Sequence, residues 1–223
     1  MNAPDQPKQQ PRWTRRKDAR PEEISAAALD LFIEHGYAGT RLDDVAARAG
    51  VSKGTVYLYF ASKEDLFKAV VREGLVSPIT EFRDVVLGQH QGSSFELLQM
   101  MVHGWWERIG ATRISGIPKL ILAEARNFPE IAGFYLEEVV KPGQAVLEAI
   151  VARGIASGEF RRVDPRDTAT LLIAPLLLIA LWRNSLGHYQ PDAIDARRVL
   201  DAHLEMVRIG LSASPPRSRR VSS

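Results

Sequence analysis

Residues 40–63, TRLDDVAARAGVSKGTVYLYFASK, predict two short helices joined by a tight turn. Thr40 is of a residue type that caps helix N-termini, so we expect it to begin the first helix. Gly50 stands where a helix end commonly takes the left-handed conformation, and Ser52 is suited to cap the second helix. Because Ala46 is small, the two helices can cross closely, which is typical of a helix-turn-helix.

The outer face of the second helix is expected to carry a cation, a glycine and three hydroxyl groups, from Lys53, Gly54, Thr55, Tyr57 and Tyr59. Cationic and hydroxyl donors suit phosphate oxygens and the base edges that line the major groove of DNA. The sequence therefore predicts that this helix binds double-stranded DNA.

The run GVSKGTVYLYFASKEDLF, residues 50–67, resembles the DNA-binding signature of the tetracycline-repressor (TetR) family. The preceding run at 27–49 fits the first two helices of that family, and the resemblance covers roughly residues 22–71. It implies operator contacts to phosphates or base edges from Thr40, Arg41, Ser52, Lys53, Gly54, Thr55, Tyr57, Tyr59 and Lys63. Leu58 stands where many relatives have tyrosine, so one hydrogen bond common in the family would be missing.

Composition excludes several other classes of protein. The chain has 223 residues, a net charge of +2 and no cysteine, so disulfides, thiol catalysis and cysteine-based zinc sites are excluded. The N-terminus has no apolar core of the kind found in signal peptides, and the most apolar run, residues 171–182, is too short to span a bilayer. We expect a soluble cytoplasmic protein that does not enter a membrane.

Four segments are predicted along the chain: a disordered basic arm at 1–20, a helix-turn-helix domain at 21–67, a helical regulatory and dimerisation domain at 68–212, and a flexible tail at 213–223. The arm is either a solvated charged tail or an extension that follows DNA. Every segment after residue 79 has helical patterning and no alternating strand appears, so the predicted fold is all-α.

The last two predicted helices indicate a homodimer. The helix beginning at Asp164 is apolar nearly all round between Leu171 and Trp182, and the last helix also carries an apolar stripe. A symmetric dimer would cover both surfaces, and the resemblance implies the same four-helix interface. The alternative is a monomer that buries this helix completely.

Aromatic side chains in the C-terminal region are candidates for an effector pocket. Most would belong to the core, but some could line a cavity between helices, as the resemblance implies for a small-molecule inducer. The candidates are Trp105, Phe134, Trp182 and His103. His103 could equally pair with Glu107 on the helix surface.

These patterns predict a repressor that a small molecule releases from its operator. The alternatives are an activator, or a ligand-independent regulator whose helical body only dimerises or binds another protein. No acid–base pair, nucleophile motif, phosphate loop or closely spaced histidine pair is present, so we expect no enzyme activity, cofactor or metal.

Overall fold

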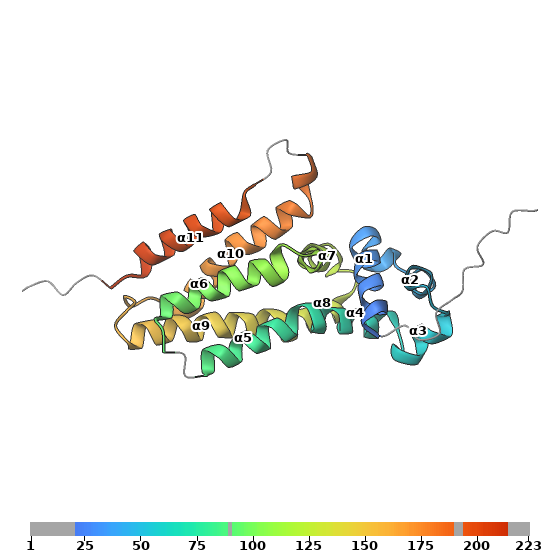
Figure 1. Ribbon diagram of the computed structural model, residues 1–223, viewed down its shortest axis with the longest axis horizontal. Helices are drawn as coiled ribbons and strands as arrows, with labels where there is room; N and C mark the ends of the chain where they lie inside the picture. The colour runs from blue at the N-terminus through green and yellow to red at the C-terminus, as the bar shows by residue number, and fades with distance from the viewer. Residues whose placement is uncertain (1–20, 89–90, 190–193, 214–223) are drawn as a thin grey trace, which may run out of the picture.

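The computed structural model describes residues 21–88, 91–189 and 194–213, so the predicted arm at 1–20 and nearly all of the tail lie outside the described residues. Within the described residues all regular elements are helices, and the only extended pairing is an isolated bridge between Phe160 and Ser212. The all-α prediction is confirmed. The molecule has a small head at one end and a longer helical body, as Figure 1 shows.

The head contains the predicted helix-turn-helix. Its helices are α1 (Pro21–Gly39), α2 (Leu42–Ala49), α3 (Lys53–Tyr59) and α4 (Lys63–Val71). Gly50 ends α2 with a φ of 71°, and the Ser52 hydroxyl accepts the Thr55 N–H at 3.1 Å, so both turn predictions are confirmed. Gly36, with a φ of 75°, ends the regular part of α1.

The prediction that Thr40 caps α2 is wrong. The N-cap position is Arg41, and no side chain caps this helix. Thr40 is buried instead, and its hydroxyl lies 2.7 Å from the Gly36 carbonyl and 3.1 Å from the Leu31 carbonyl. The hydroxyl therefore fastens the α1–α2 connection to α1.

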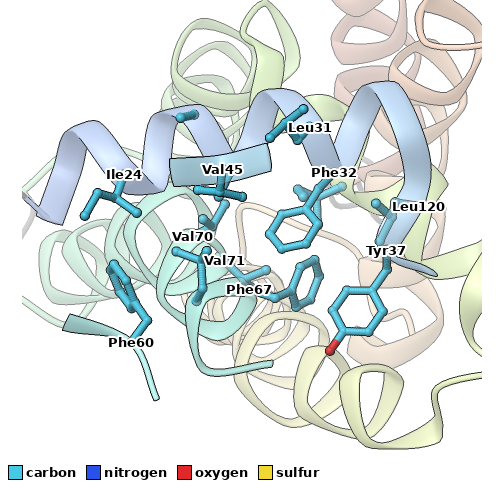
Figure 2. Packing of buried hydrophobic residues seen from close by; sticks show 14 of the residues in the cluster. Ile24, Leu31, Phe32, Tyr37, Val45, Phe60, Phe67, Val70, Val71 and Leu120 are labelled. Atoms are coloured by element: carbon cyan, nitrogen blue, oxygen red, sulfur yellow. The ribbon is translucent and has the colours of Figure 1, made fainter. Parts of the chain in front are cut away.

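The core of the head is aromatic at its centre, as Figure 2 shows. Phe32 and Phe67 meet edge to face at 5.2 Å, and Tyr37 meets Phe67 in the same manner at 5.4 Å. The same apolar cluster continues into the body through Leu120 and Ile131. The predicted boundary at residues 67 and 68 thus falls inside one shared core and within α4.

A single helical rod links the head to the body. It runs from α4 through a π-helical segment, η1 (Arg72–Val76), into α5 (Ser77–Leu87). The sequence predicts a bend or break near Gly74 and Pro78, but the backbone at the junctions of η1 stays helical and Pro78 lies in the first turn of α5. A Cβ atom at Gly74 would overlap the Ile114 side chain, so a larger residue there would force Ile114 to move.

The remaining helices form the body. They are α6 (Ser94–Trp105), η2 (Trp106–Gly110), η3 (Arg113–Gly116), α7 (Ile117–Glu124), α8 (Pro129–Tyr135), η4 (Leu136–Val140), α9 (Lys141–Ala156), α10 (Pro165–Arg183), η5 (Leu186–Tyr189) and α11 (Ala196–Leu211). Asp164 caps α10, the helix expected to begin at this residue, and Ser93 caps α6. Both η2 and η4 are π-helical, like η1.

Apolar side chains on α10 and α11 remain exposed. Leu171 is 71% exposed and Leu178 is 62% exposed on α10, while Met206 and Ile209 are exposed on α11. The helix α10 continues through Pro175 to a length of 19 residues, so it is longer than the apolar run and passes a length and composition test for a membrane span. One such helix is weak evidence for a membrane, and one face of α10 packs against α9.

Candidate functional site

The helix α3 lies at the outer end of the head, away from the body (Figure 1). Val56 and Phe60 are buried, as expected for the inward face of this helix. Exposed on its other faces are Lys53, Gly54, Tyr57, Leu58 and Tyr59. The predicted outer face therefore exists, apart from Thr55, which is half-buried and shares a hydrogen bond of 2.8 Å with the Ser52 hydroxyl.

The charge on this surface is partly paired, which the sequence did not indicate. The Lys53 ammonium lies 2.8 Å from the Asp43 carboxylate of α2, and this hydrogen bond raises the pKa of Lys53. Both groups are exposed, so water screens the pair. A phosphate that approached Lys53 would compete with Asp43 for the ammonium. Arg41 is exposed, and among the described residues none forms a hydrogen bond or ion pair with its guanidinium group.

Gly54 is notable because the protein itself does not require a glycine there. A Cβ atom at this position would meet only the Ser52 hydroxyl, at an ordinary contact distance of 3.7 Å. Glycine within a helix is less stable than alanine by roughly 0.5–1 kcal/mol. A glycine without an internal steric cause is expected where another molecule approaches the backbone closely.

Two of the predicted phosphate contacts have their polar groups engaged inside the head. The one hydroxyl hydrogen of Thr40 is directed at carbonyl oxygens, so this buried side chain has no hydrogen left to donate to a phosphate. The Lys63 ammonium donates to the Tyr37 carbonyl at 2.8 Å and lies 4.5 Å from the centre of the Tyr37 ring, and burial lowers the pKa of Lys63. Lys63 therefore fixes the C-terminal end of α1.

A large apolar cavity lies in the body, with a volume of about 460 Å³. Helices from α5 to α10 surround it, and Leu75 of η1 contributes to the wall nearest the head. Most lining side chains are aliphatic, including Ile79, Ile121, Val139, Leu147, Ile173 and Leu177. The size lies within the range of small-molecule sites in proteins, about 300–1,000 Å³.

Of the predicted effector residues only Trp105 lines this cavity. Phe134 instead packs beside the head, where the Arg72 guanidinium lies 5.0 Å from the centre of its ring. Trp182 borders a separate, shallower depression next to Trp106.

His103 does not line the cavity either. His103 lies 3.6 Å from Asp201, and Glu107 pairs with Arg197 at 2.9 Å. The proposed surface pair between His103 and Glu107 is therefore replaced by two contacts to α11, one from α6 and one from η2. The aliphatic residues that form most of the cavity wall carry no sequence signal that separates them from ordinary core.

Comparison with known proteins matches this arrangement in both parts of the chain. Residues 24–70 match the model for bacterial regulatory proteins of the tetR family, and residues 90–203 match a tetracyclin repressor-like C-terminal domain. The chain belongs to the TetR family. It is therefore a member of a family of DNA-binding transcriptional regulators, and the resemblance seen in residues 22–71 is confirmed.

Similar proteins include regulators from several bacteria. The HTH-type transcriptional regulator RutR of Escherichia coli K12 is 26% identical over 208 residues, covering 86% of this chain and 83% of RutR. The uncharacterised regulator YfiR of Bacillus subtilis is 41% identical over 154 residues, covering 68% of this chain and 73% of YfiR. The crystal structure of the regulator FadR from B. subtilis with stearoyl-CoA has a TM-score of 0.66 at 22% identity, covering 86% of this chain and 99% of FadR. At this level of identity, FadR is similar to this chain in fold alone.

Proposed function

We propose that this TetR-family regulator is a cytoplasmic homodimeric repressor that a small molecule releases from its operator, and that it catalyses no reaction. The observation that carries the proposal is the single rod from α4 to α5. Its head end belongs to the core that supports α3, and Leu75 and Ile79 on the same rod line the cavity. A ligand that contacts these two side chains acts directly on the element that positions the head.

In this proposal Lys53, Gly54 and Tyr57 lie nearest to base edges, and Tyr59 and Arg41 donate to phosphates. Support for this assignment comes from the exposure of these residues, and from the Arg41 guanidinium, which forms no hydrogen bond or ion pair with a described residue. Ser52 and Thr55 form the first turn of α3 and hold its N-terminus in place. Thr40 and Lys63 act by stabilising the head.

The proposed dimer pairs α10 and α11 with their copies in the partner. Support comes from the exposed leucines of α10 and the exposed Met206 and Ile209 of α11, which together leave an apolar surface that a monomer would present to water. A two-fold dimer would place two α3 helices at half-sites about one turn of DNA apart.

The test is a fluorescence-anisotropy titration with DNA from upstream of the gene, beside a scrambled fragment of equal length and at two salt concentrations. A sequence-specific regulator binds the upstream fragment more tightly, and Tyr57→Ala weakens that binding. Tyr189→Ala is the matched control, because Tyr189 is also an exposed tyrosine but lies in the body. Equal affinity for both fragments would contradict the proposal of sequence-specific recognition.

The sign of regulation is measured with a reporter gene behind the same upstream fragment. Higher expression after deletion of the regulator gene supports repression. Lower expression would instead identify an activator.

A further inference from the structure

The cavity wall has no charged side chain. The lining residues that carry a hydroxyl, amide or indole N–H group are Tyr135, Gln144, Thr170 and Trp105. An ionised group transferred into such a site would lose its hydration and find no opposite charge, which is strongly unfavourable. The part of a ligand that enters this cavity is therefore uncharged.

Two polar side chains of the wall form no hydrogen bond within the described residues. The Tyr135 hydroxyl forms no hydrogen bond with any described residue, and burial raises the pKa of Tyr135 to about 12. The side chain of Gln144 is likewise without a hydrogen bond to a described residue, whereas the Thr170 hydroxyl donates to the Arg166 carbonyl at 3.1 Å. Buried polar groups in proteins are nearly always hydrogen-bonded to protein or to water, so a half-buried phenol with no protein partner in the cavity wall is available to bind a ligand.

The wall is also built in an unusual way. All three π-helical segments of the described chain border the cavity, through Leu75 of η1, Ile109 of η2, and Leu136, Val139 and Val140 of η4. Segments of this kind are rare and occur frequently at functional sites. Leu122, Leu136 and Val140 are exposed as well as part of the wall, so the cavity opens to solvent between α7 and η4.

We propose that the effector is a predominantly apolar molecule whose buried part is uncharged and carries an oxygen that accepts a hydrogen bond from Tyr135. Aliphatic side chains surround the apolar body, and the Gln144 amide is available for a second polar contact. This inference rests on the proposed function, since it names the chemical class of the molecule that the cavity would sense. Alcohols, ketones and esters of lipophilic molecules have this chemistry.

The test uses the purified full chain and displacement of the neutral fluorescent dye aminoanthracene by decane, decanol and decanoate. The wild-type protein should bind decanol about fivefold more tightly than decane, because one neutral hydrogen bond contributes roughly that factor. Decanoate, which is ionised at neutral pH, should bind at least about tenfold more weakly than decanol. Tighter binding of decanoate than of decanol would overturn the proposal.

Tyr135→Phe isolates the role of the hydroxyl. This variant should bind decanol no better than decane, with its affinity for decane unchanged and its melting temperature not lowered, since the lost hydroxyl has no partner in the protein. Tyr37→Phe is the matched control, because Tyr37 also has a pKa of about 12 through burial but lies in the head core outside the cavity. A Tyr135→Phe variant that kept the preference for decanol, or that melted at a lower temperature, would overturn the assignment.

The displacement assay contains no DNA, so its outcome is separate from that of the proposed function. Wild-type protein that distinguishes the upstream fragment from the scrambled one but fails to prefer decanol contradicts only the ligand class. Protein that prefers decanol but binds both DNA fragments equally contradicts only the regulator proposal.

Discussion

The substitution Gly54→Ala should change stability and DNA affinity in opposite directions. The added methyl group has free space in the protein, since its nearest neighbour is the Ser52 hydroxyl at 3.7 Å. Alanine is more stable than glycine in a helix by roughly 0.5–1 kcal/mol, which corresponds to a rise in melting temperature of about 1–4 °C for a chain of this size. We therefore expect the free protein to become more stable.

The same methyl group should weaken operator binding. If the backbone of α3 approaches the DNA at Gly54, the methyl group overpacks a close contact, which costs about 1–3 kcal/mol and weakens affinity by roughly fivefold to a hundredfold. The two measurements are thermal unfolding of the free protein and anisotropy with the upstream DNA fragment.

Gly133→Ala is the matched control for this prediction. Gly133 is exposed within α8, a Cβ there meets nothing within 4 Å, and the helix lies far from α3 in sequence. This variant should gain similar stability and keep its affinity for the operator. Unchanged operator affinity in Gly54→Ala would refute the close approach of DNA, and a lower melting temperature would refute the open space at this position.

Three further predictions concern separate parts of the molecule. Tyr57→Phe should lower operator affinity by about three- to tenfold in the anisotropy assay without changing the melting temperature, because it removes one exposed hydroxyl donor. Leu178→Glu should weaken dimerisation roughly a hundredfold or more, measured by sedimentation, because each protomer loses about 1.5 kcal/mol of apolar burial. The Arg72 guanidinium beside Glu138 holds the pKa of that carboxyl below its usual range. The pair therefore stabilises the fold at pH values above the unfolded pKa of about 4.3. This contribution is lost as the pH falls through the lower pKa of the folded protein. Glu138→Gln should therefore reduce stability to urea by less than about 1 kcal/mol near pH 7 and by nothing near pH 2, and equal losses at both pH values would contradict this.

Local signals in the sequence were sufficient to predict the helix-turn-helix. Gly50, Ser52 and Asp164 act through atoms within a few residues of themselves, so their roles follow from sequence order alone. The side chains of Thr40 and Lys63 bind carbonyl oxygens of α1, which the sequence does not show because these contacts depend on how the chain folds back. A side chain that can cap a helix or bind a phosphate can equally form a long-range hydrogen bond, so the residue type alone does not distinguish these roles.

The cavity was the least predictable feature. The sequence favours aromatic and polar residues as candidates for a ligand site, yet of the four candidates only Trp105 borders the cavity. Its wall is made of aliphatic side chains whose pattern matches that of any buried helix, so only the packing shows that space remains between them. Tyr135, the informative polar residue, is not among the candidates, because its missing hydrogen-bond partner cannot be seen in the sequence.

The π-helical turn at Arg72–Val76 has a consequence for how such a protein can change over generations. A π turn holds one residue more than the α-helix on either side of it, and each residue of an α-helix contributes about 100° of rotation and 1.5 Å of rise. Loss of a single codon in this segment would change the rotation and the rise between α3 and the cavity, while α3 and every lining residue of the cavity apart from Leu75 kept their sequence. One small deletion can thus alter the relative orientation of the DNA-binding helix and the cavity, without any new contact having to evolve at either end.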